Sequence, residues 1–283
     1  MTSEKLFTAW GLPPDFLAHH WRRGHALGRC AEADAPGRLP PAQVDALLGQ
    51  GVRADRVSIS TAGRLHHPAE FTHARTIAGQ PVADLVDEEK VRRLLDAGAT
   101  VVLANAEHWV PAVRELCGQL TEDFGCEVEA HVFRTGAGHS GLVPHADGED
   151  NFLLQLDGRK TWSLWAREGA APSRVDPENL GRPTARVTLT PGDVLYIPVG
   201  WVHAATAGEE GSTHITYQVL PDTLVDAVLA QLGDALEELL GDRLLPAPGP
   251  PPLAREAAAD LAERIAELLR HPAHPGGAHP PSR

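Results

Sequence analysis

The feature that most limits the fold of this chain is a change of hydrophobic period at Glu127. From there, apolar residues alternate or form short runs, and turns that contain glycine or proline separate the runs. The predicted strands lie at 127–133, 151–156, 161–165, 186–189, 194–197 and 212–219. Several short strands at this spacing are typical of a sandwich or barrel and not of a parallel α/β sheet. We therefore predict an α+β chain that is mainly β.

Helices are predicted on both sides of the strands. Upstream they cover 15–21, 40–48 and about 109–124, with a short β-branched strand at 99–103 between them. Downstream, 222–241 carries a broad apolar stripe, and a second amphipathic helix follows a proline-rich linker. The predicted division is a helical or mixed region packing on the barrel (1–126), the strand core (127–220), C-terminal helices (221–270) and a disordered tail (271–283).

The C-terminal helices are too apolar to stand alone in water. They can pack on the barrel or on a second subunit, and the second possibility predicts a homodimer.

Charge and composition exclude several classes of protein. The formal net charge of -13 disfavours nucleic acid, because contact with phosphates needs a basic face. Such a charge suits a basic protein or peptide substrate, although it equally keeps a protein in solution. No apolar run approaches the roughly 20 residues of a membrane span. The start of the chain lacks a signal-peptide pattern, and three unpatterned cysteines predict no disulfide framework, so we expect the cytoplasm.

Two short motifs supply a set of metal ligands. The segment from Gly192 to His203 reads G-x5-P-x-G-x2-H, which predicts a buried strand, a tight turn at Gly200 and then a histidine. Upstream, His145 and Asp147 are two residues apart, so on a strand both side chains share one face. Two imidazoles and one carboxylate hold non-haem Fe(II) and leave coordination positions open. Among fifteen histidines either motif alone is a weak signal, so the prediction depends on their joint occurrence.

This combination resembles the cupin barrels. Their first motif carries a second histidine where this chain has Asp147, and a glutamate where it has Asn151. An amide binds Fe(II) poorly, so the resemblance implies a three-ligand site with an open face for substrate and O2.

A wider resemblance is to the JmjC-type 2-oxoglutarate oxygenases, and within them to the ribosomal oxygenase branch. It is carried by 141–162, 191–198 and 212–218. It implies a double-stranded β-helix (jelly-roll) core and a dioxygenase that uses Fe(II) and 2-oxoglutarate. In that family a basic residue pairs with the far carboxylate of 2-oxoglutarate, and Lys160 stands at its position. Asn151 resembles a residue that hydrogen-bonds the metal-bound end of 2-oxoglutarate, and Thr216 lies on a strand that lines the same pocket.

The resemblance implies hydroxylation of a side-chain carbon in a protein or peptide. His131 and Phe133 stand where relatives carry polar or phenolic residues near the cosubstrate, which leaves part of the polar pocket unassigned. The chain after Leu220 is too short for a winged-helix domain as well as the helices, which leaves the substrate open. One alternative is therefore a hydroxylase of a peptide natural product or a free amino acid. Another is a metal-binding cupin without 2-oxoglutarate chemistry, which would need neither Lys160 nor Asn151. A scaffold dimer would have no use for the three ligands.

Overall fold

The computed structural model describes residues 3–30, 36–49, 51–167, 175, 177–221 and 263. The chain divides into two units, Met1–Pro221 and Asp222–Arg283, and the elements below belong to the first. Apart from residue 263, the helices predicted after Pro221, the linker between them, the tail and the dimer contact lie outside the described residues and stay predictions. The four-part division of the chain also stays a prediction.

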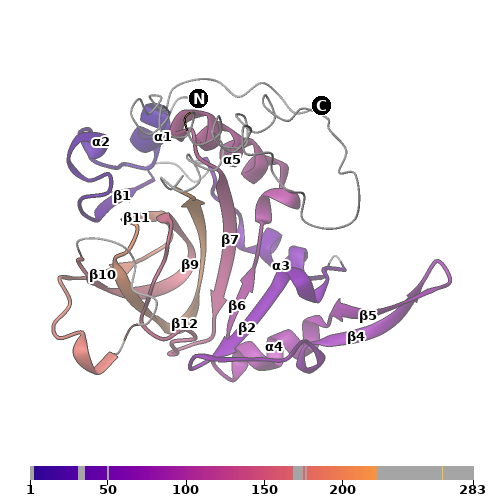
Figure 1. Ribbon diagram of the computed structural model, residues 1–283. Coiled ribbons are helices and arrows are strands. Elements are labelled where there is room, and N and C mark those ends of the chain that lie inside the picture. The colour runs from indigo at the N-terminus through magenta and orange to yellow at the C-terminus, as the bar shows by residue number, and fades with distance from the viewer. Residues whose placement is uncertain are drawn as a thin grey trace. The chain divides into compact units, whose positions relative to one another are not determined.

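Ten antiparallel strands form one sheet (Figure 1), in the order β1-β11-β9-β12-β7-β6-β2-β3, with β10 beside β9 and β8 beside β12. Their bounds are β1 (Ala26–Arg29), β2 (Val57–Thr61), β3 (Arg64–Leu65), β6 (Thr100–Leu103), β7 (Val128–Thr135), β8 (His145–Ala146), β9 (Asp150–Trp165), β10 (Ala185–Leu189), β11 (Asp193–Ile197) and β12 (Val202–Val219). The prediction of a mainly β chain is confirmed, and the antiparallel core is consistent with a jelly roll.

The two longest strands, β9 and β12, pair with each other along most of their length and bend together. At the bend, Gly158 has a φ of +62°, and a Cβ there would lie 2.2 Å from the carbonyl oxygen of Gly211. Only glycine fits such an approach of two backbones. The sequence predicted two strands, 151–156 and 161–165, because Gly158 suggested a turn. The structure instead has one bent strand, and that bend lets its two halves line different parts of the barrel.

Successive side chains of a strand point in opposite directions, and in the first half of β9, residues 150–156, both faces are buried. Phe152, Leu154 and Leu156 belong to the core shared with the N-terminal helices, whereas Leu153 and Trp162 belong to a second cluster. Helices α1 (Ser3–Ala9), α2 (Phe16–His19) and α5 (Pro111–Phe124) cover the first of these faces. Aromatic contacts fix them there: the ring of Phe7 lies 5.7 Å from that of Phe152, and Phe16 lies 4.8 Å from Tyr196.

The region before residue 127 contains more β structure than its sequence predicted. Strand β1 extends the sheet beside β11, and β6 and β2 extend it beyond β7. Strands β4 (Thr72–Ile77) and β5 (Gln80–Val86) form a separate two-stranded arm (Figure 1). Helices α3 (Pro41–Gly49) and α4 (Glu88–Asp96) complete the region, and short 3-10 turns lie at Ala54–Arg56, Pro68–Glu70, Ala106–His108 and Pro177–Asn179.

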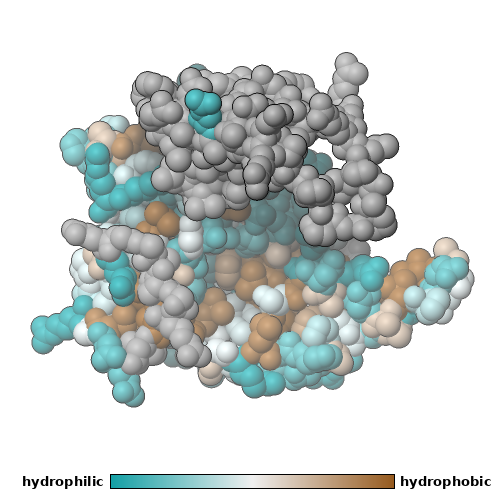
Figure 2. Space-filling model, in the orientation of Figure 1, coloured by the Kyte–Doolittle hydropathy of each residue, from teal (hydrophilic) through white to brown (hydrophobic). Residues whose placement is uncertain are grey.

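The surface mixes polar and apolar residues, with apolar ones gathered near the middle of the face drawn in Figure 2. The large apolar side chains with the greatest exposure are Leu65 and Val143. Within the described residues, no helix is both long and apolar enough to cross a bilayer.

Candidate metal centre

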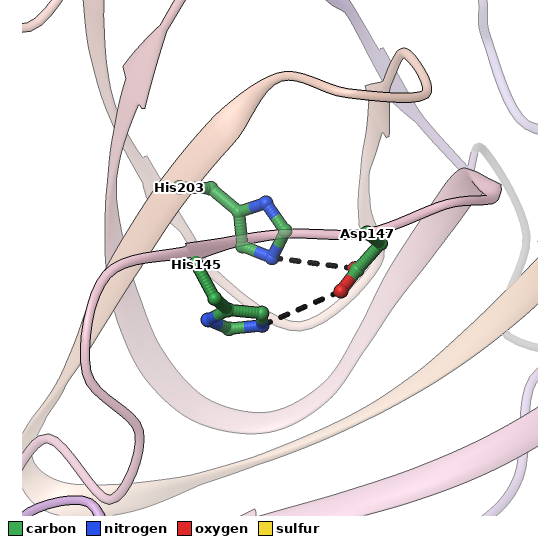
Figure 3. A group of neighbouring side chains, drawn as sticks. All are labelled: His145, Asp147 and His203. Carbon is green, nitrogen blue, oxygen red and sulfur yellow. Dashed lines mark ion pairs between the residues drawn. The ribbon is translucent and has the colours of Figure 1, made fainter. Parts of the chain in front are cut away.

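Strand pairing brings the three predicted metal ligands together (Figure 3). His145 on β8 lies directly opposite His203 on β12 in the antiparallel ladder, and Asp147 follows two residues after His145. The carboxylate oxygens of Asp147 lie 3.6 Å from His145 Nε2 and 3.5 Å from His203 Nε2. One ligand atom from each residue falls within 4.8 Å of the other two. Such a cluster fits one divalent metal ion, with part of its coordination sphere left to other ligands.

Backbone carbonyls orient both imidazoles toward this point. His145 Nδ1 lies 2.9 Å from the carbonyl oxygen of Val143, and His203 Nδ1 lies 3.2 Å from that of Trp201. A carbonyl only accepts, so each Nδ1 carries the proton and each Nε2 keeps its lone pair for a metal. Burial lowers the pKa of His203 below its usual range, which also favours the neutral, metal-binding form.

One amide holds the carboxylate of Asp147, and a second amide holds the first. Asn151 Nδ2 donates to Asp147 Oδ2 at 2.9 Å, and Gln218 Nε2 donates to Asn151 Oδ1 at 3.0 Å. Asn151 itself is buried, while both of its partners are partly exposed. Asn151 thus supports a ligand in this structure, while its contact with 2-oxoglutarate stays a prediction.

We expect Asn151→Ala to weaken metal binding by about tenfold to a hundredfold, as the loss of a hydrogen bond to a ligand commonly does. The carboxylate of Asp147 would lose its fixed orientation, and Gln218 would lose its acceptor. Titration with Co(II), followed by visible absorption, gives the dissociation constant, and near-UV circular dichroism checks the fold. Affinity equal to that of the wild type would mean that Asp147 is held by other contacts.

A buried carboxylate fixes the turn that delivers His203. Asp150 has no exposed surface, and it accepts hydrogen bonds from Arg22 Nε, the Tyr196 hydroxyl and the backbone N–H of Val199. The turn itself bonds back to the metal ligands, because the N–H of Gly200 donates to the carbonyl of Asp147 at 3.0 Å. Gly200 has a φ of +78°, which confirms the predicted reason for glycine there.

All six predicted site residues line one cavity of about 90 Å³, which includes the three metal ligands, Asn151, Lys160 and Thr216. Lys160 is buried, and its Nζ donates to the Thr135 hydroxyl at 3.1 Å and lies 5.4 Å from the centre of the Trp162 ring. Burial lowers the pKa of Lys160 to about 7, and no carboxylate of the described residues offsets that effect. A buried ammonium without a counter-ion is unfavourable, so this end of the cavity favours an anionic ligand.

Among the lining residues that sequence reasoning missed are the polar side chains of His214 and Gln218. Both lie on β12 at two-residue spacing from Thr216, so the alternation of a strand could have found them. Phe133 also lines the cavity, whereas His131 is not among the lining residues. The ring nitrogens of His131 face the N–H of Asn105 and the carboxylate of Glu129 instead.

The sequence of this chain is similar to those of known proteins. Residues 104–226 match the sequence model of the JmjC domain family. The bifunctional lysine-specific demethylase and histidyl-hydroxylase NO66 of Drosophila simulans is 36% identical over 153 residues, which are 48% of this chain and 18% of that protein. NO66 of Dictyostelium discoideum is 36% identical over 149 residues, which are 50% of this chain and 29% of that protein. The chain therefore spans less than a third of these relatives.

Solved structures show the same fold. The ribosomal oxygenase YcfD of Escherichia coli, in complex with cobalt and 2-oxoglutarate, superimposes with a TM-score of 0.59. The match covers 92% of this chain and 67% of YcfD, at 19% sequence identity. The complex of YcfD with cobalt and succinic acid gives a TM-score of 0.58. Residues 104–226 therefore match the JmjC domain family, and the chain is similar in sequence to NO66 and in fold to YcfD.

Proposed function

We propose that this protein is an Fe(II)- and 2-oxoglutarate-dependent dioxygenase that hydroxylates a side-chain carbon of a protein or peptide. The observation that carries the proposal is the buried Lys160, which has no carboxylate partner among the described residues and lines the same cavity as three convergent metal ligands. The ligand set suits Fe(II), and the lysine suits the far carboxylate of a 2-oxo dicarboxylate. YcfD, which shares the fold, binds cobalt and 2-oxoglutarate.

The residues divide the work between the two ends of the cavity. His145, Asp147 and His203 would hold the metal, and Asn151 keeps the carboxylate in place. Lys160 would hold the far carboxylate, with Thr135 keeping the ammonium in position. When bound, Fe(II) with 2-oxoglutarate and O2 supplies the oxidation that places one oxygen atom on a substrate carbon and leaves succinate and CO2. The apolar walls from Leu153, Trp162 and Ile197 exclude water from the site.

A protein substrate is favoured by the relatives, which include a histidyl-hydroxylase and a ribosomal oxygenase. The net charge of -13 favours a basic one. A cytoplasmic location and a homodimer through the C-terminal segment remain parts of the proposal. A peptide natural product or a free amino acid is the second substrate class.

The test is incubation of the Fe(II)-loaded protein with 2-oxoglutarate, O2 and basic ribosomal or histone-tail peptides. We expect a peptide to gain the mass of one oxygen atom together with an equal amount of succinate. Reactions without 2-oxoglutarate, and with His203→Ala, should give neither product. Succinate without any peptide oxidation would point to the second substrate class. Metal binding without any 2-oxoglutarate binding would support the cupin alternative and contradict the proposal.

A further inference from the structure

His214 is a buried polar side chain that has no role in the reaction proposed above. It is 1% exposed, and its Nδ1 has no hydrogen-bond partner among the described residues. Its ring stacks on Phe133 at 4.8 Å and meets the edge of Trp162 at 5.4 Å. The two aromatic rings therefore fix the orientation of the imidazole, while a polar nitrogen stays unpaired. An unpaired buried polar atom is costly and calls for an explanation.

The position of His214 on β12 and beside Trp162 points to the anion-binding end of the cavity. His214, Thr216 and Gln218 follow one another at two-residue spacing on β12, and all three line the cavity. Gln218 marks the metal end, because it donates to Asn151, which holds Asp147. His214 is two positions further from that end than Thr216. The His214 ring and the Nζ of Lys160 each lie 5.4 Å from the centre of the Trp162 ring, and the ring of the metal ligand His203 lies 5.8 Å from it.

The charges at this end suit one carboxylate. Burial and the neighbouring ammonium of Lys160 lower the pKa of His214 well below its usual value, so the ring is neutral and keeps a single N–H. Lys160 provides the charge, and a neutral ring beside it adds a hydrogen bond without a second buried cation. The indole N–H of Trp162 is also buried without a partner among the described residues. Of the cavity-lining residues only Asp147 is acidic, and it belongs to the metal end.

We propose that His214 donates a hydrogen bond to the far carboxylate of the 2-oxo acid and, together with Lys160, selects a dicarboxylate over a monocarboxylate. This inference rests on the proposed function and adds a specificity residue to it. It also accounts for Phe133, whose ring provides no hydrogen bond and instead supports the imidazole that does.

The test compares two ligands of the same chain length, 2-oxoglutarate and 2-oxovalerate, which has a methyl group in place of the far carboxylate. Calorimetric titrations of the Mn(II)-loaded protein, without oxygen, give both dissociation constants. His214→Phe keeps an aromatic ring between Phe133 and Trp162 but removes the N–H. We expect it to weaken 2-oxoglutarate binding by about tenfold to a hundredfold, the value of one hydrogen bond to a charged group. Its affinity for 2-oxovalerate should stay within about threefold of the wild type.

A second variant, which keeps a hydrogen-bond donor at position 214, and a spectroscopic measurement on the wild-type protein test the same contact independently. His214→Gln should retain most of the preference for 2-oxoglutarate. In the wild-type protein, 2-oxoglutarate but not 2-oxovalerate should shift the side-chain ¹⁵N resonances of His214, which tests the contact even if a variant fails to fold.

A His214→Phe protein that retains the wild-type preference, or that loses affinity for both acids equally, would overturn the role of His214 and leave the proposed function standing. An unshifted His214 resonance with bound 2-oxoglutarate would overturn it too. A wild-type protein that binds neither acid would contradict the proposed function itself.

Discussion

Replacing His203 with alanine is expected to abolish metal binding in the usable range, with at least a hundredfold loss of affinity, because two ligands remain where three converged. His203 is the most buried of the three and provides its Nε2 opposite the Asp147 carboxylate. All 2-oxoglutarate-dependent activity should disappear with the metal. Equilibrium dialysis against Mn(II) or Co(II) measures the effect directly.

His108→Ala is the matched control, since His108 is exposed and lies outside the cavity. It should bind metal like the wild type. If His203→Ala folds normally, as judged by circular dichroism, and still binds one metal ion with wild-type affinity, then His203 is not a ligand and the metal binds at another site.

The second large effect is expected at Lys160, where one substitution should weaken 2-oxoglutarate binding and raise the stability of the ligand-free protein. In Lys160→Met, the stabilisation of the metal-loaded protein by 2-oxoglutarate should be lost, because the far carboxylate has no counter-ion. The ligand-free variant should nevertheless be more stable than the wild type, by roughly 1–4 kcal/mol, because an unpaired buried charge has been removed. Thermal and urea unfolding with and without ligand measure both effects, and Lys5→Met, at an exposed position, is the control.

The stability difference should depend on pH with a definite sign. Burial lowers the pKa of Lys160 to about 7 in the folded protein, against about 10.5 when the chain is unfolded. The unfolded chain therefore binds more protons between these values, and stability rises with pH across that interval. The advantage of Lys160→Met should be largest at or below pH 7 and vanish as the pH approaches 10.5. A constant difference across this range would mean that Lys160 is not buried as a charge.

Local sequence patterns were enough to predict much of the site. His145 and Asp147 share a face because they are two residues apart on an extended segment, and Gly200 permits the turn before His203. The structure adds what no local pattern contains, namely the register that sets His145 opposite His203. The roles of Lys160, Asn151 and Thr216 came from resemblance, and the cavity that contains all three remains consistent with those roles.

The parts that sequence reasoning missed depend on contacts between distant segments. Gly158 looked like the end of a strand, but the close approach of Gly211 makes it a bend within β9. Strand β6 joins the sheet by pairing with β7, and β2 joins it by pairing with β6. The hydrophobic pattern within each strand cannot predict these pairings. His214 looks like any core histidine until Lys160, 54 positions earlier in the chain, is seen beside the same Trp162 ring.

The most direct test of the central claim is the fate of labelled oxygen. The Fe(II)-loaded wild type is incubated with 2-oxoglutarate, a substrate peptide and ¹⁸O₂. The masses of the succinate and of the peptide are then measured by mass spectrometry. A 2-oxoglutarate-dependent dioxygenase should place one ¹⁸O atom in succinate and one in the hydroxylated peptide, and both should depend on His203. Absence of 2-oxoglutarate-dependent succinate from the metal-loaded protein, with or without peptide, would contradict the central claim.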